Sequence, residues 1–238
     1  MNPYQKLMAR KRKWTPVQTT AGECKVGAEE AIHRALAMRH MELPVGDFIS
    51  NALNSEVPAL AREVLVSNVK DEENHDIALG YIANAYGVDP QAEKEALRLK
   101  TAWEAHPDHT ITKALVAERA IFFVLLPFFR FNGDAGMRTV SADISRDEQI
   151  HVAVNSLAHT ELGYNISPSL DKLRKATINW VMQPLGINTQ DKYLDKKFWL
   201  DSSDRLMYEG KAPQLAETKS ARMPAFFEHS NVNLPQYA

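Results

Sequence analysis

Cysteine is nearly absent from this sequence, since Cys24 is the only one among 238 residues. A single cysteine excludes an intrachain disulfide framework and agrees with a reducing compartment, so we expect a cytoplasmic protein. The chain has no run of about 18 apolar residues, the length that a membrane-spanning helix needs. Its N-terminal residues also lack the apolar core of a signal peptide. We therefore expect no membrane partner.

An excess of charge of either sign is also missing, because 28 basic and 30 acidic residues leave a net charge of −2. Such a balance provides no global attraction to nucleic acid, and we expect no nucleic-acid partner. The one basic run, Arg10-Lys11-Arg12-Lys13, is typical of a solvated N-terminal arm.

Few stretches alternate with the two-residue period of a strand, whereas helical periodicity is widespread, so the sequence predicts an all-α fold. Pro44 is expected to kink the first long helix, because proline lacks the backbone donor. We expect an N-terminal arm over 1–21, one helical domain over 22–208 and an extended tail over 209–238. The predicted helices cover 24–54, 57–86, 91–106, 110–132, 137–161 and 168–183, with shorter pieces around 189–208.

Two copies of one metal-binding pattern stand out, Glu72-Glu73-Asn74-His75 and Glu148-Gln149-Ile150-His151. Residues three apart lie on one face of a helix, so each copy directs a carboxylate and an imidazole to the same point. A further glutamate precedes each copy by thirty residues, Glu42 and Glu118. Four carboxylates and two imidazoles at the centre of a four-helix bundle are the ligand set of a two-metal site.

A third copy, Glu30-Ala31-Ile32-His33, shows that the pattern alone does not identify ligands. If the first hairpin turns near Asn54, the residue level with Glu72 on the preceding helix lies near position 40. Glu42 fits this height, whereas Glu30 would be displaced by roughly 15 Å along the helix. We interpret Glu30 and His33 as a solvated or structural pair.

The octet from Ile144 to His151, ISRDEQIH, resembles the "ISRDExLH" signature of the radical-generating small subunit of class I ribonucleotide reductase. Three shorter segments agree in order: Lys13-Trp14-Thr15-Pro16 is similar to the family's "FWT", Glu118–Phe123 to its "EGIFF" helix with one more residue, and Phe226-Phe227-Glu228 to its "NFFE". The resemblance spans residues 13 to 228. It implies a ferritin-like helical bundle with a central four-helix dimetal core and additional helices.

The resemblance also implies roles for individual residues. Trp14 would pass an electron between the surface and the metals, with Asp147 hydrogen-bonded to it and His75 completing the route. Tyr237 would be the relay in the tail. The residues also have structural interpretations: Trp14 as an aromatic anchor, Asp147 as the carboxylate that orients a histidine, and Tyr237 as an ordinary terminal aromatic. The metal ligands would be Glu42, Glu72, His75, Glu118, Glu148 and His151.

One position departs from the family. The radical-bearing tyrosine is expected four residues after the first ExxH histidine, and that position is Leu79. On the same helix, Tyr81 faces another direction and Tyr86 lies about 16 Å further along the axis than His75. The oxidising equivalent would then be stored elsewhere, most simply on the metals, with a tyrosine of another helix as the alternative.

The resemblance therefore implies a ribonucleoside-diphosphate reductase small subunit that activates dioxygen at two metals for a large catalytic subunit. The metals would be manganese with iron or two irons, with two manganese ions also compatible. A homodimer follows from the resemblance, with the apolar faces of the first two helices as its interface. The main alternative is a ferritin-like oxygenase or oxidase, similar to aldehyde-deformylating enzymes, that acts directly on a small apolar substrate. Metal storage and a purely structural helical protein are further alternatives.

Overall fold

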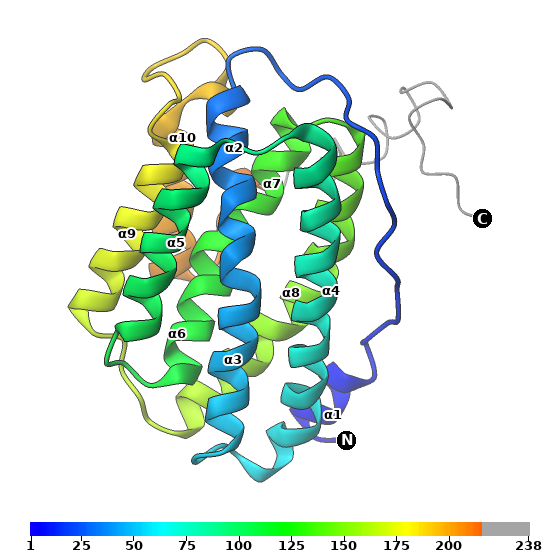
Figure 1. Ribbon diagram of the computed structural model, residues 1–238. Helices are drawn as coiled ribbons and strands as arrows, with labels where there is room; N and C mark the ends of the chain where they lie inside the picture. The colour runs from blue at the N-terminus through cyan, green and yellow to red at the C-terminus, as the bar shows by residue number, and fades with distance from the viewer. Residues whose placement is uncertain (216–238) are drawn as a thin grey trace.

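The computed structural model describes residues 1–215, which form a bundle of helices (Figure 1). Its described part contains no β-strand, and Gly186 and Asp195 form an isolated bridge. The predicted all-α class is confirmed. None of the described helices combines the length and the apolar composition that crossing a membrane would need.

The helices follow the order that the sequence predicts. The α-helices are α1 (Pro3–Met8), α2 (Glu29–Ala37), α3 (Glu42–Leu53), α4 (Arg62–Tyr86), α5 (Pro90–Ala105), α6 (Thr110–Ala117), α7 (Phe123–Asn132), α8 (Ala135–Glu161), α9 (Pro168–Met182) and α10 (Lys196–Glu209). Short 3₁₀ turns occupy Met38–Met41, Ala59–Ala61, Lys192–Leu194 and Pro213–Leu215, and a π-helical turn, Glu118–Phe122, joins α6 to α7.

Four helical rods surround the centre of the bundle: α3, α4, α8 and the continuous α6–α7 rod. α3 packs on α4 and α6, and α8 packs on α4, α6 and α7, so the four rods enclose a common interior. The helices α5, α9 and α10 lie on the opposite side of α3 from α4 in Figure 1. Between the two layers, the ring of Phe128 on α7 packs against that of Trp199 on α10, with centroids 5.3 Å apart.

Side chains that cap the first turn set the beginnings of α8 and α9. The side chain of Asp134 accepts a hydrogen bond from the backbone N–H of Met137 at 2.8 Å, and Ser167 caps α9 through Leu170 at 3.1 Å. Such caps satisfy backbone donors that the first turn leaves free. Glycine is required at position 133, because a Cβ there would lie 2.7 Å from the Cβ of Met137.

The first predicted helix, 24–54, is interrupted. It consists of α2 and α3 with the 3₁₀ turn Met38–Met41 between them, directly before Glu42. The cause is Pro44, whose missing N–H would have bonded the carbonyl of His40 inside that turn. The sequence predicts a kink at Pro44, and the helix is interrupted one turn before the proline ring.

The sequence predicts an irregular N-terminal arm, and this prediction is wrong in part, because the arm begins with the helix α1. Beyond α1 the chain runs along α4 toward the other end of the bundle (Figure 1). The basic run is not simply solvated either: Lys11 pairs with Asp71 and is 8% exposed in its side chain, and Arg12 pairs with Asp143 at 3.1 Å. The domain boundaries at 21/22 and 208/209 stay predictions.

Candidate dimetal centre

All six predicted ligands converge in the interior of the four central rods. Each is at most 1% exposed. They form two overlapping groups that share Glu72. Within each group, the candidate ligand atoms lie within 4.8 Å of one another. We name these groups position A (Glu42, Glu72, His75, Glu148) and position B (Glu72, Glu118, His151).

The separations between ligand atoms suit two neighbouring cations bridged by carboxylates. In position A, the Nδ1 atom of His75 lies 3.4 Å from Glu72, 3.4 Å from Glu148 and 3.7 Å from Glu42. In position B, the Nδ1 atom of His151 lies 2.9 Å from Glu72 and 3.8 Å from Glu118. The two imidazole rings stack with centroids 5.6 Å apart.

Both histidines present the same nitrogen to the centre. The Nε2 atom of His75 lies 3.4 Å from Asp147 and that of His151 lies 3.0 Å from Asp71, which places the ring proton on Nε2. Both Nδ1 atoms lack a hydrogen-bond partner, as do oxygens of Glu42, Glu72, Glu118 and Glu148. Buried polar atoms are normally satisfied. Carboxylate–imidazole pairs with a free inner nitrogen are the usual arrangement around a protein-bound metal, so the residues fit two metal ions.

The pKa values of the ligand carboxyl groups reflect their burial beside one another. Burial raises the pKa of Glu42 and Glu118 well above the usual range, and it also raises the pKa of Glu148. Burial opposes ionisation of Glu72 too, but the imidazoles of His151 and His75, which lie 2.9 and 3.4 Å from its carboxylate, outweigh burial and lower its pKa. Four carboxylates in this interior match the charge of two divalent cations, which would remove most of the cost of ionising them.

The pKa values of the two histidines are raised, although burial alone would lower them. Burial alone lowers the pKa of His151, but its hydrogen bond with Asp71 and the nearby Glu72 carboxylate outweigh burial and raise the pKa to about 10. For His75, burial is likewise outweighed by the hydrogen bond with Asp147 and the nearby Glu148 carboxylate, and its pKa lies well above the usual value. Without metal the cluster therefore holds protons that metal binding must displace.

Comparison with known proteins supports the architecture. No protein-family model matches the sequence, and no curated protein matches it. Among solved structures, the chain is similar to a protein from Bacillus halodurans described as a "putative class I ribonucleotide reductase". The TM-score is 0.58 at 13% sequence identity, over 95% of this chain and 98% of the other. The chain has a ferritin-like fold. At this identity the similarity establishes the fold alone, and the expected helical bundle with a central four-helix core is confirmed.

The ferritin-like centre has an outer layer that only partly follows from the sequence. Trp14 donates its indole N–H to Asp147 at 2.5 Å, and its ring stacks on His75 with centroids 6.1 Å apart. The structure thus brings together Trp14, Asp147 and His75, as the resemblance implied.

Asp71 and Lys11 occupy the equivalent place beside His151, and we did not predict either residue. Asp71 accepts hydrogen bonds from His151 and from Lys11. The signal was present, because an aspartate precedes both ExxH copies, giving Asp71-Glu72 and Asp147-Glu148. Asn155 was also missed; its side-chain amide donates to Glu118 at 2.6 Å.

The π-helical turn positions Glu118. Glu118 is its first residue. Helix α10 holds the turn: Ser203 donates to the carbonyl of Ala120 at 2.6 Å and Arg119 donates to that of Leu206 at 2.8 Å. Single π turns inside α-helices frequently mark functional sites.

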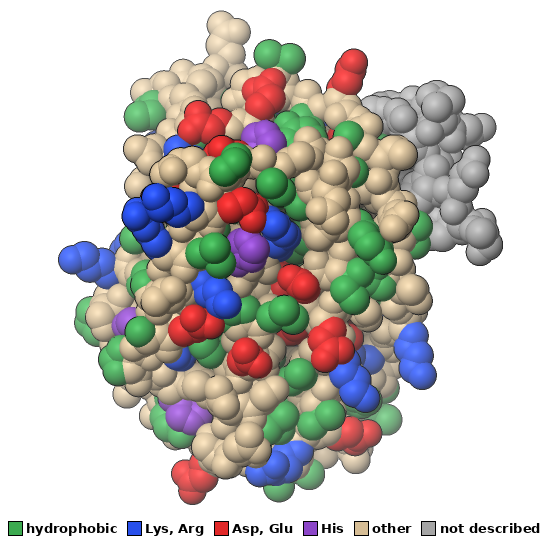
Figure 2. Space-filling model, viewed as in Figure 1, with side chains coloured by type: hydrophobic (Ala, Val, Ile, Leu, Met, Phe, Trp, Pro, Cys, Tyr) green, Lys and Arg blue, Asp and Glu red, His purple; other side chains and the backbone are tan. Residues whose placement is uncertain are grey.

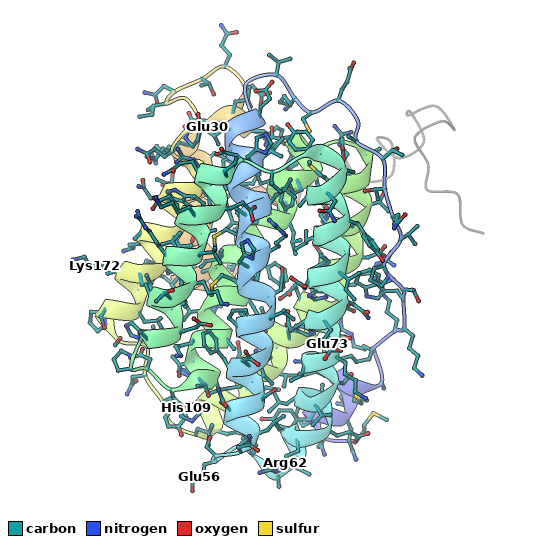
Figure 3. The ribbon with its side chains drawn as sticks, viewed as in Figure 1. Glu30, Glu56, Arg62, Glu73, His109 and Lys172 are labelled. Carbon is teal, nitrogen blue, oxygen red and sulfur yellow. The ribbon has the colours of Figure 1, made fainter. Side chains whose placement is uncertain are left out.

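The third ExxH copy lies outside the centre. Glu30 is exposed and pairs with Arg34 at 2.7 Å, while His33 packs on the ring of Tyr86. Figure 3 shows Glu30 at the end of the bundle, far in height from Glu73, the outward-facing neighbour of Glu72. The height argument thus separated the ligand-like glutamates from the third copy.

Leu79 is buried, one helical turn after His75. Tyr237 and the Phe226-Phe227-Glu228 segment lie outside the described residues.

Proposed function

We propose that this chain is the radical-generating small subunit of a class I ribonucleoside-diphosphate reductase. The observation that carries the proposal is the contact chain from Trp14 through Asp147 to His75. A metal-storage protein needs no such connection between a surface arm and one metal ligand. The reduction of ribonucleotides would take place on a separate large subunit.

The six clustered residues would hold the two metals through carboxylate oxygens and imidazole Nδ1 atoms. Oxygen-rich ligation with some nitrogen suits iron and manganese, either one of each, two irons or two manganese ions. Bound there, the metals would supply reactivity toward dioxygen and an oxidising equivalent.

The residues around the metals would control the movement of the electron and its proton. Trp14 is half-buried in the arm, so one edge can face a partner while its N–H points inward to Asp147. Asp147 is fully buried and accepts from both Trp14 and His75. It is therefore placed to hold the indole proton when Trp14 is oxidised, while keeping the imidazole of His75 oriented.

The oxidising equivalent would be stored without the usual tyrosine. Leu79 cannot be oxidised. Tyr86, the tyrosine of α4 that shares the face of His75, packs on His33. Storage on the metals themselves is the simplest remaining arrangement. Tyr237 would complete the relay to the large subunit.

A homodimer through the outer faces of α3 and α4 is part of this proposal. Leu43 on α3 and Val66 and Ile77 on α4 are between 45% and 48% exposed. Figure 2 shows hydrophobic side chains among charged ones on the face that these helices form. Exposed apolar side chains gathered on one face mark candidate interfaces.

The second candidate function is an oxidase or oxygenase that acts on a small apolar substrate. It is favoured by the apolar Leu79 one turn from His75, since a buried leucine there could line a substrate pocket instead of replacing a radical tyrosine.

The two candidates differ in what the isolated chain can do. After aerobic reconstitution with iron, manganese or both, the reductase proposal requires ribonucleotide reduction only when a large subunit is added. Turnover of an aldehyde or fatty substrate by the isolated chain, without reductase activity in the mixture, would replace it by the oxygenase.

A further inference from the structure

The N-terminal arm supplies a different hydrogen-bond donor beside each of the two metal positions. Both histidines bond an aspartate through Nε2, and each aspartate receives one further donor from the arm. At position A that donor is the neutral indole of Trp14, on Asp147. At position B it is the positively charged ammonium group of Lys11, on Asp71.

The surroundings of position A and of position B therefore differ by one unit of charge. Beside position A, the indole N–H that Trp14 donates to Asp147 carries no charge and so cannot offset that of the carboxylate. Beside position B, Lys11 cancels the charge of Asp71. This difference favours a cation at A.

We propose that Lys11 is a positioning residue that makes the two metal positions inequivalent, so that a divalent cation occupies position A before position B. The inference rests on the metal sites of the proposed function, but not on ribonucleotide reduction. Lys11 acts through Asp71 and does not touch the metal.

The burial of the pair makes the effect sizeable. The side chains of Lys11 and Asp71 are 8% and 13% exposed, so bulk water screens them less than it screens surface charges. A unit charge some 8–10 Å from a divalent cation, at an effective dielectric constant of about 20, changes the affinity by at least about tenfold.

The experiment measures occupancy at each position separately. Crystals of the full chain are equilibrated with Mn²⁺ at less than one equivalent and then at two, and anomalous scattering from manganese gives the occupancy of A and of B. Stepwise dissociation constants come from titration calorimetry of the same protein. Neither readout needs a large subunit or catalytic turnover.

Wild-type protein should fill A first. Lys11→Met should tighten position B by about tenfold or more, so that sub-stoichiometric manganese divides between the positions. Lys11→Arg keeps the charge and should behave as wild type. Lys13→Met is the matched control, since it removes the same charge from an exposed residue of the same run.

A second variant separates charge from structure. Lys11→Met combined with Asp71→Asn removes both charges and should restore the preference for A, whereas a purely structural role of Lys11 predicts no such restoration. Equal filling of A and B by wild-type protein, or a Lys11→Met variant that still fills A first, would overturn the inference while leaving the dimetal site intact. Absence of any bound manganese and iron in wild type would overturn both the inference and the proposed function.

Discussion

Asp71 accepts a hydrogen bond from His151 of α8 at 3.0 Å, although Asp71 shares its own helix with His75. Conversely, Asp147 of α8 lies 3.4 Å from the Nε2 atom of His75 on α4. Each imidazole is thus oriented by the helix opposite to its own. The ligands therefore reach their geometry only when α4 and α8 pack in one antiparallel register, which links assembly of the bundle to assembly of the site.

Metal content should depend sharply on which of two adjacent glutamates is changed. Glu72 belongs to both metal positions, so Glu72→Ala should reduce the metal content from two ions per chain to less than one. Glu73→Ala is the matched control, because Glu73 is exposed on the outer face of α4 (Figure 3). Elemental analysis after reconstitution measures both. Two ions retained in Glu72→Ala would contradict the bridging position of this residue.

The sequence sufficed for the bundle and for the convergence of the six ligand-like residues because both depend on spacing along helices. Residues three apart share a helix face whatever the tertiary contacts are. The separation of Glu42 from Glu30 needed only the position of a turn and the rise per residue. In the same way Leu79, one turn after His75, lies where helix geometry places it.

The missed features depend on contacts between segments distant in sequence. Lys11 reaches Asp71 across 60 positions, and no periodicity in the arm predicts its path. The π turn at Glu118 depends on α10, whose Ser203 bonds the carbonyl of Ala120. The short helix α1 depends on packing of Tyr4 and Leu7 against the bundle, since six residues are too few to be stable alone.

Trp14→Phe should abolish ribonucleotide reduction in the presence of a large subunit while the chain still binds two metals. Phenylalanine fills most of the space but can neither donate to Asp147 nor be oxidised as readily as an indole. Trp180→Phe is the matched control, because Trp180 is half-buried beside Arg34, away from the centre. Assays of turnover and metal content should show loss only for Trp14→Phe. Full turnover in this variant would sink the proposed electron route.

The metal-free protein should lose stability as the pH rises from about 6 to 9. The pKa of His151 is about 10 in the folded chain against 6.5 in the unfolded one, so its contribution is complete below 6.5 and declines toward 10. The raised pKa values of Glu42, Glu118 and Glu148 act in the same direction, because ionising them costs more in the folded state. The lowered pKa of Glu72 stabilises the protein equally throughout this range.

Thermal unfolding of the metal-free and metal-loaded chain across this range checks the prediction. Each kcal/mol lost corresponds to about 2–4 °C for a chain of this size, and a fall of several degrees is expected without metal. Metal-loaded protein should change much less, since the cations replace the protons. A metal-free chain that gains stability toward pH 9 would contradict the assigned hydrogen bonds of His151.

Self-association should be sensitive to the outer face of α4 and insensitive to that of α5. Ile77 and Leu97 are both 45% exposed, on α4 and α5 respectively. Ile77→Asp should convert a dimer to a monomer in sedimentation velocity, because a carboxylate would be buried without a partner. Leu97→Asp should leave the dimer intact. If only Leu97→Asp dissociates it, the interface lies on the α5 side.

Leu79→Tyr should create a tyrosyl radical where the wild-type chain has none. Leu79 is 5% exposed and follows His75 by one helical turn, so a phenol there would lie near position A, within the reach of an oxidised metal centre. Reconstitution with iron and dioxygen should then give a tyrosyl signal in electron paramagnetic resonance. Leu79→Phe adds similar bulk without the hydroxyl and should give none, which separates radical formation from a packing defect. If Leu79→Tyr binds two metals yet stays silent, the side chain at 79 is too far from the centre to exchange an electron with it, and the absence of a tyrosine there would not explain storage on the metals.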